Sequence, residues 1–168
     1  PLSGSLPPWA GGVPVDQGAI RRLEASLALL KPVGTRLTHD FYNRLFARHP
    51  GLRVIFPTDM AEQEKKLFAS LVAVVEHLRD PGLLRQSIQE KGKRHAGYGA
   101  KPEHYPIVCG LLLESMAATL GGAWTPELSA EWAQALQLVS AAMIEGAGGG
   151  AKPPGSEHTT RGEGPTRV

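Results

Sequence analysis

Residues 85–110 read RQSIQEKGKRHAGYGAKPEHYPIVCG, and this stretch decides how the rest of the chain is interpreted. It places His95 at the end of a helical pattern, before a connector broken by glycine and proline and the start of a further helix. Leu84, Ile88 and His95 are spaced so that a helix carries them on one face. Such a histidine is either a satisfied core residue or a ligand that holds the iron of a flat, buried cofactor. Spacing alone leaves both interpretations open.

Length and composition limit the classes of protein to consider. The chain has 168 residues, enough for one domain with a sizeable core, and a formal net charge of +2. Its basic residues are spread along the chain, without the concentrated face that binds nucleic acid, so no nucleic-acid partner is expected. Cys109 is the single cysteine, which excludes an internal disulfide and a cysteine-based zinc site and fits a cytoplasmic setting. No apolar run approaches the ~20 residues of a membrane span, so no membrane insertion is expected.

Apolar residues recur at helical spacing along the chain, and the alternation typical of strands does not occur. This pattern predicts an all-α fold of about six or seven helices. Asp16 and Thr125 precede two of them as predicted N-caps. The other predicted helices lie in 35–49, 59–78, the segment that ends at His95, and 102–120.

The two ends of the chain differ in composition from the middle. Residues 1–15 are rich in proline, glycine and serine and are interpreted as a flexible leader. From Gly146 onward the chain is again rich in glycine and proline. We therefore expect one domain over 16–147 and a disordered tail or linker over 148–168.

Two side chains are unusual for a plain helical bundle. Phe56 lies in a connector before a proline, where a large aromatic side chain needs something to pack against. Gln63 is four residues before Leu67 and thus heads the apolar stripe of the 59–78 helix. An unpartnered amide buried there costs roughly 1–3 kcal/mol. Either that end of the helix is open to water or the amide has a partner.

Three stretches resemble one family. They are HDFYNRLFARHPGLRVIF, EQEKKLF and KRHAGYGAKPEHYPIV, and the last is the most typical. On these residues the chain resembles a globin, and more narrowly the globin domain of bacterial flavohaemoglobins and the related single-domain bacterial haemoglobins. The resemblance covers about residues 18–147. It implies the globin fold, a three-on-three helical sandwich, with haem b as the cofactor and O2, NO and CO as ligands.

The resemblance also implies a role for individual residues. His95 matches the proximal ligand of the haem iron, and Phe56 matches the aromatic residue that wedges the haem. The distal side is matched by Tyr42, Gln63 and Leu67, and Tyr105 matches a tyrosine of the proximal side.

One position departs from the family. Globins of this group have a glutamate on the last helix that bonds to the proximal histidine, and counting from Trp132 puts Ala147 there. Glu145 lies two residues earlier, a rotation of about 200° on a helix, and so points away. Without a carboxylate behind it, His95 should push less electron density onto the iron. This favours ligand binding over redox chemistry.

We therefore expect reversible oxygen binding at a five-coordinate iron. Tyr42 and Gln63 carry hydrogen-bond donors for a bound ligand, which predicts high oxygen affinity. One alternative is nitric oxide dioxygenation with a separate reductase, because no glycine-rich dinucleotide fingerprint follows a strand in this chain. Another is a haem-based gas sensor module of a larger protein.

Overall fold

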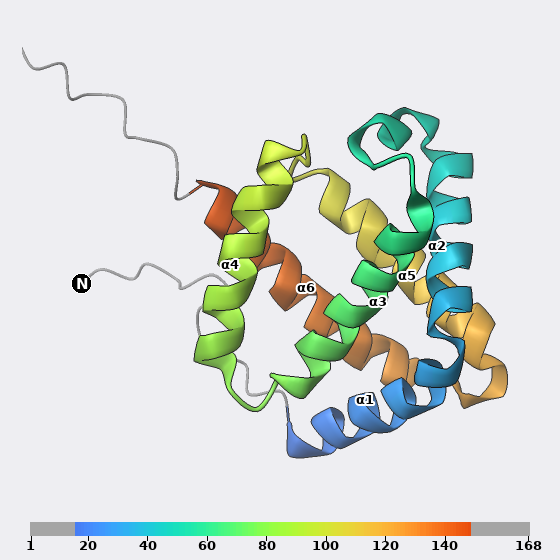
Figure 1. The fold of residues 1–168 in the computed structure, drawn as a ribbon. Helices are drawn as coiled ribbons and strands as arrows, with labels where there is room; N and C mark the ends of the chain where they lie inside the picture. Colours follow the sequence, from blue (N-terminus) through green and yellow to red (C-terminus); the bar gives the residue numbers. More distant parts are fainter. Residues whose placement is uncertain (1–15, 149–168) are drawn as a thin grey trace, which may run out of the picture.

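The computed structural model describes residues 16–148, so the predicted leader and all but the first residue of the predicted tail lie outside the described residues. Six α-helices and three short 3-10 segments make up this range, without a strand, as predicted (Figure 1). The α-helices are α1 (Gln17–Leu30), α2 (Gly34–Arg48), α3 (Met60–Glu76), α4 (Pro81–Gly97), α5 (His104–Leu120) and α6 (Pro126–Gly148). The 3-10 segments are Lys31–Val33, Pro50–Ile55 and Gly121–Ala123.

Side-chain caps begin four of the helices. Asp16 Oδ1 accepts a hydrogen bond from Gly18 N at 3.3 Å, and Thr125 Oγ1 accepts one from Leu128 N at 3.1 Å. Both caps confirm the sequence prediction. Asp59 and Asp80 cap α3 and α4 in the same way, so acidic or hydroxyl side chains satisfy amide groups that have no partner within the helix.

Helix α6 runs through the middle of the molecule, with α1, α4 and α5 packed against it (Figure 1). Its Trp132 has no exposed surface, and the indole Nε1 donates to Ser26 Oγ of α1 at 2.9 Å. The Ser26 hydroxyl donates in turn to the Leu23 carbonyl at 2.8 Å. This buried chain of hydrogen bonds satisfies the indole and fixes α1 on α6.

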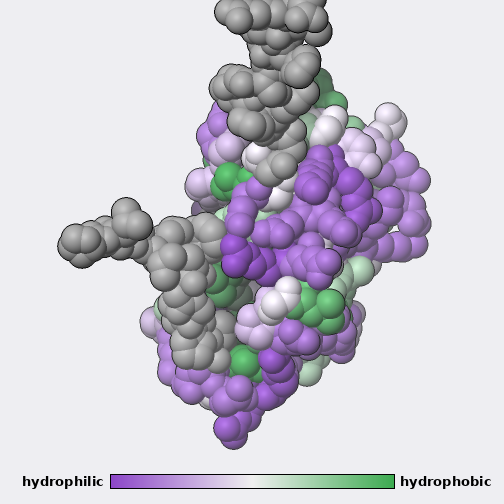
Figure 2. All heavy atoms as spheres, turned by 90° about the vertical axis from the view of Figure 1, so that its left-hand side faces the viewer, coloured by the Kyte–Doolittle hydropathy of each residue, from purple (hydrophilic) through white to green (hydrophobic). Residues whose placement is uncertain are grey.

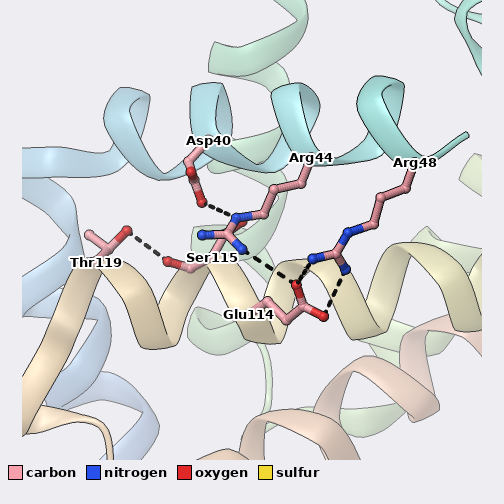
Figure 3. A network of polar contacts seen from close by, with 6 residues as sticks. All are labelled: Asp40, Arg44, Arg48, Glu114, Ser115 and Thr119. Atoms are coloured by element: carbon pink, nitrogen blue, oxygen red, sulfur yellow. Dashed lines mark hydrogen bonds and ion pairs between the residues drawn. The ribbon is translucent and has the colours of Figure 1, made fainter. Parts of the chain in front are cut away.

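A polar network joins α2 to α5 on the outside of the core (Figure 3). Arg44 donates to Asp40 at 2.7 Å within α2, and Arg48 reaches Glu114 of α5 at 2.9 Å. Hydrogen bonding from Arg48 lowers the pKa of Glu114. Burial raises the pKa of Asp40, but hydrogen bonds, led by the one from Arg44, lower it overall. The network fixes the helix that carries Tyr42.

One segment, His104–Ala123, is long and apolar enough to cross a membrane by length and composition alone. No such run was expected from the sequence. In the structure α5 packs between α2 and α6, and its side chains Leu111, Leu112, Ser115 and Met116 are buried there. A core helix passes the same test, so this segment is weak evidence for a membrane span.

Helix α6 continues to Gly148, past Gly146, where the composition suggested that regular structure ends. Gly146 is buried in contact with α4. A glycine that resembles a helix stop in the sequence is therefore a packing position in the fold.

Candidate functional site

Tyr42 lies in a cluster of aromatic rings at the junction of α2 with the segment before α3. Its side chain is only 3% exposed. Its ring centroid is 4.9 Å from that of Phe41, 5.8 Å from Phe46 and 5.5 Å from Phe56. We call these four residues the aromatic wall. Phe56, singled out from its position in a connector, thus has the packing partners it was expected to need.

The amide of Gln63 has a partner. Its Nε2 donates to Tyr42 Oη at 3.2 Å, which joins α3 to α2. The sequence left two alternatives open, a helix end open to water or an amide with a partner. The structure shows an amide with a partner. Because the phenol oxygen accepts this bond, its own proton is left to be donated elsewhere.

Burial determines the protonation of Tyr42. It raises the pKa of the phenol to about 12, although the hydrogen bond from Gln63 acts in the opposite direction. The phenol is therefore a neutral hydrogen-bond donor throughout the physiological pH range.

Arg53 supports Phe56, a role that the sequence analysis missed. Its Nη1 donates to the carbonyl oxygens of Phe56 at 3.2 Å and Pro57 at 2.9 Å. Its guanidinium also lies 5.2 Å from the centroid of the Phe46 ring. A basic residue in a short apolar segment has no periodicity to mark it, so only the folded loop reveals these contacts.

His95 lies in the last turn of α4, exposed at its surface, with its Nδ1 2.8 Å from the carbonyl oxygen of Lys91. A carbonyl can only accept, so Nδ1 donates and Nε2 of the neutral ring retains its lone pair. Metal-bound histidines commonly donate their other nitrogen to a carbonyl in this way. His77 of α3 makes the same local bond, to Ala73 O at 2.7 Å, so position in the fold rather than this bond distinguishes His95.

No carboxylate is hydrogen-bonded to His95 among residues 16–148. Glu145 Oε1 instead accepts from Arg85 Nη2 at 2.7 Å, close to the first turn of α4. Ala147 is half-buried on α6, and its methyl side chain cannot accept a hydrogen bond.

The remaining two candidates lie on α3 and α5. Leu67 is half-buried and packs against the core. Tyr105 is half-buried in the first turn of α5, and burial raises the pKa of its phenol. The structure thus joins Tyr42, Phe56 and Gln63 in direct contact, whereas no hydrogen bond within the described residues links these three to His95 or Tyr105.

A cleft of about 230 Å³ separates α3 from α4. The residues lining it are Ser70, Ala73, Val74, His77, Leu83, Leu84, Ser87, Ile88 and Lys91. His95 lies on the helix face that carries Leu84 and Lys91, one turn beyond the cleft. Figure 2 views the side of the molecule on which α4 lies and shows hydrophobic residues between largely hydrophilic ones.

The histidine of α4 suits a metal ion that is already coordinated by a cofactor. Residues 16–148 contain no group of three or more His, Cys, Asp or Glu side chains placed to hold a metal ion. One imidazole with a free Nε2 can complete the coordination of an iron already held in a macrocycle. Half-buried apolar side chains of several elements, including Phe56, Leu67, Leu84 and Val108, provide surface for a flat apolar group.

A helical domain with a buried tyrosine–glutamine pair on α2 and α3, and a histidine in the last turn of α4, has the kinds of side chain that a haem-binding helical protein uses. The chain belongs to the globin family, which it matches over residues 39–143. Membership of this family implies haem binding. The fold prediction and the resemblance on which it relied are confirmed.

Curated relatives of similar sequence are flavohemoproteins. The chain is 36% identical to the flavohemoprotein of Bordetella pertussis over 125 residues, which cover 73% of this chain and 31% of that protein. It is 31% identical to that of Bacillus subtilis over 135 residues, which cover 77% of this chain and 33% of the relative. The chain thus spans about a third of the length of the relatives it matches.

Solved structures have the same fold. A globin from Campylobacter jejuni superimposes with a TM-score of 0.71 at 22% identity, covering 78% of this chain and 95% of that one. An engineered carbene transferase, described as a putative nitric oxide dioxygenase from Rhodothermus marinus, gives 0.70 at 24% identity, with 79% and 93% covered.

Proposed function

We propose that this globin binds oxygen reversibly at haem b, with His95 as the proximal ligand and Tyr42 and Gln63 on the distal side. When bound, haem supplies an iron with one open coordination position, at which O2, NO or CO can bind. The observation that carries the proposal is the hydrogen bond from Gln63 to Tyr42, because it leaves the proton of a buried, neutral phenol free to be donated.

Each residue of the proposed site has a distinct task. His95 offers Nε2 to the iron while its Nδ1–H is held by the Lys91 carbonyl, which fixes the ring orientation. Tyr42 would donate a hydrogen bond from its phenol to a polarised ligand, and Gln63 orients that phenol. Hydrogen bonds to charged partners contribute roughly 1.5–3 kcal/mol, which corresponds to about tenfold or more in dissociation rate.

The aromatic wall keeps water from the proposed ligand position. Tyr42 is packed by three phenylalanine rings, so its hydroxyl is the principal polar group that this wall contributes. Exclusion of water strengthens a hydrogen bond to a polarised ligand, because the local dielectric constant is low.

The first test is an absorption spectrum of the purified protein, reduced and then exposed to oxygen and to carbon monoxide. A haem band that responds to both gases, and is lost in His95→Ala, is the expected result. A protein that stays colourless after haem is added would overturn the proposal.

Nitric oxide dioxygenation is the second candidate, favoured by the similarity to flavohemoproteins. In this reaction one NO, one O2 and one electron give one nitrate ion. The reaction consumes an electron, which a reductase has to supply, and this chain spans only about a third of the length of those relatives. Nitrate formation at a rate set by added reductase would support this function, whereas stable oxygen binding without nitrate formation would exclude it.

A further inference from the structure

Helix α4 is attached to the domain chiefly through α6. Among its residues only Ile88 and Gly92 are buried, and α6 is its principal packing partner. At 100° per residue, Gly92 and Arg85 lie on one side of Ile88, whereas Lys91 and His95 lie on the other. One face of α4 therefore holds the helix to the domain, and the adjoining face carries the proposed iron ligand.

The contact between α4 and α6 is made by backbone atoms at two glycines. A Cβ added to Gly92 would overlap the carbonyl oxygen of Met143 and lie 2.7 Å from its carbonyl carbon. A Cβ added to Gly146 would do the same to the carbonyl group of Gln89, again with 2.7 Å to the carbon. No side chain other than hydrogen fits at either position.

The two contacts are reciprocal. Each glycine lies three residues after the carbonyl that the other touches, Gln89 before Gly92 and Met143 before Gly146. The segment from Gln89 to Gly92 therefore lies against the segment from Met143 to Gly146 where the two helices cross. Small residues let helix backbones approach this closely, and Cα–H groups then contact carbonyl oxygens directly.

An ion pair lies beside the crossing. Arg85 Nη2 donates to Glu145 Oε1 at 2.7 Å, while Glu145 Oε2 is buried without a hydrogen-bond partner in the described part of the chain. Glu145 immediately precedes Gly146, so the charge contact and the backbone contact hold the same stretch of α6. We call Gly92, Gly146, Arg85 and Glu145 the α4–α6 clamp.

We propose that the α4–α6 clamp positions His95, taking the place of a carboxylate bonded directly to the imidazole. The Ala147 side chain cannot accept a hydrogen bond from Nδ1, and Nδ1 instead bonds to the backbone carbonyl oxygen of Lys91 in the same helix. The ring is therefore oriented relative to α4 alone, and the clamp sets where α4 lies. This inference rests on the proposed function, since it concerns how the proximal ligand is held.

The test compares glycines that differ in their surroundings. Gly92→Ala and Gly146→Ala add a methyl group where there is no room. Gly82→Ala and Gly148→Ala add one on the same two helices, with nothing closer than 3.9 Å at Gly82 and nothing within 4 Å at Gly148. Each variant is loaded with haem and reduced. The iron–histidine stretching band is recorded by resonance Raman spectroscopy, and haem loss is followed by transfer to excess apomyoglobin.

In the clamp variants we expect the iron–histidine band to shift or broaden and haem loss to be at least tenfold faster. Both control variants should match the unaltered protein. A clamp variant that only lowers the unfolding temperature, with the band and the haem-loss rate unchanged, would overturn the inference and leave the proposed function intact. Failure of the unaltered protein to bind haem would instead overturn the proposed function.

A second variant covers the case in which Gly92→Ala does not fold. Glu145→Ala keeps both glycines and removes only the ion pair, and Glu90→Ala, exposed on α4, is its control. The inference requires a broadened iron–histidine band and haem loss several-fold faster in Glu145→Ala. Values equal to those of Glu90→Ala would refute it.

Discussion

The two sides of the proposed site are held in different ways. On the α2–α3 side, contacts between side chains hold the site. Tyr42 is buried among three aromatic rings and is hydrogen-bonded to Gln63. The polar network in Figure 3 fixes the helix that carries it. On the α4 side only Ile88 and Gly92 are buried, and contact between the backbones of α4 and α6 holds α4 in place. Side-chain chemistry thus specifies the proposed gas-binding side, and the close approach of two helices specifies the proposed iron-binding side.

The largest expected effect comes from removing the iron ligand. His95→Ala should lose stable haem binding, because α4 contains no other histidine. His77→Ala is the matched control, since His77 makes the same bond to the carbonyl four residues earlier. Haem content per chain after gel filtration measures the effect. Equal haem content in the two variants would show that His95 is not the iron ligand.

The next effect concerns the α2–α3 side alone. Tyr42→Phe should raise the oxygen dissociation rate about tenfold or more, because one donated hydrogen bond is removed while the ring packing is kept. Tyr98→Phe, at a position that is 68% exposed, is the control. Stopped-flow displacement of oxygen by carbon monoxide gives the rate. An unchanged rate would remove Tyr42 from the distal role and reduce it to a core residue.

A smaller effect is expected from high pH. The pKa of Tyr42 is about 12 when folded and about 10 in an unfolded chain. Below pH 10 both states keep the proton, so there is no effect. Between about pH 10 and 12 only the unfolded state loses it, so the free energy of unfolding falls by about 1.4 kcal/mol per pH unit. Urea unfolding of the wild type and Tyr42→Phe at both ends of this window isolates the contribution, and parallel pH profiles would contradict it.

The smallest effect tests the support of the aromatic wall. Arg53→Ala should lower the free energy of unfolding by about 1 kcal/mol and speed haem loss a few-fold, because carbonyl bonds and a ring contact are lost. Arg36→Ala, exposed on α2, is the control. If the two variants lose haem equally fast, Phe56 is held by ring packing alone.

Local signals in the sequence predicted much of the fold. Asp16 and Thr125 were identified as caps because a cap and its amide lie within a few residues of each other. Gln63 was marked as needing either water or a partner, since a polar side chain heading an apolar stripe is an energetic conflict. The sequence alone could not select Tyr42 as that partner, 21 residues away, and the family resemblance had only put the two residues on the same side of the haem.

The features that were not foreseen depend on contacts between distant segments. Gly146 was seen only as the point where the glycine-rich composition begins, because its packing role becomes visible only when Gln89 lies against it. Arg53 had no periodicity to place it. The pairing of Glu145 with Arg85 depends on α4 and α6 being packed against each other, which no local pattern specifies.

The position of Gly146 has a consequence for heating. The last turn of α6 contains Gly146 and Gly148, and glycine is a poor helix former at a terminus that already tends to fray. The contact that holds α4 is therefore on the turn of α6 that frays most readily. Local opening of that turn would release α4, which carries the proposed iron ligand, at temperatures at which α1, α2 and the Trp132 region are still folded. Cofactor loss should then precede global melting, with amide exchange in α4 rising in step with that of the end of α6.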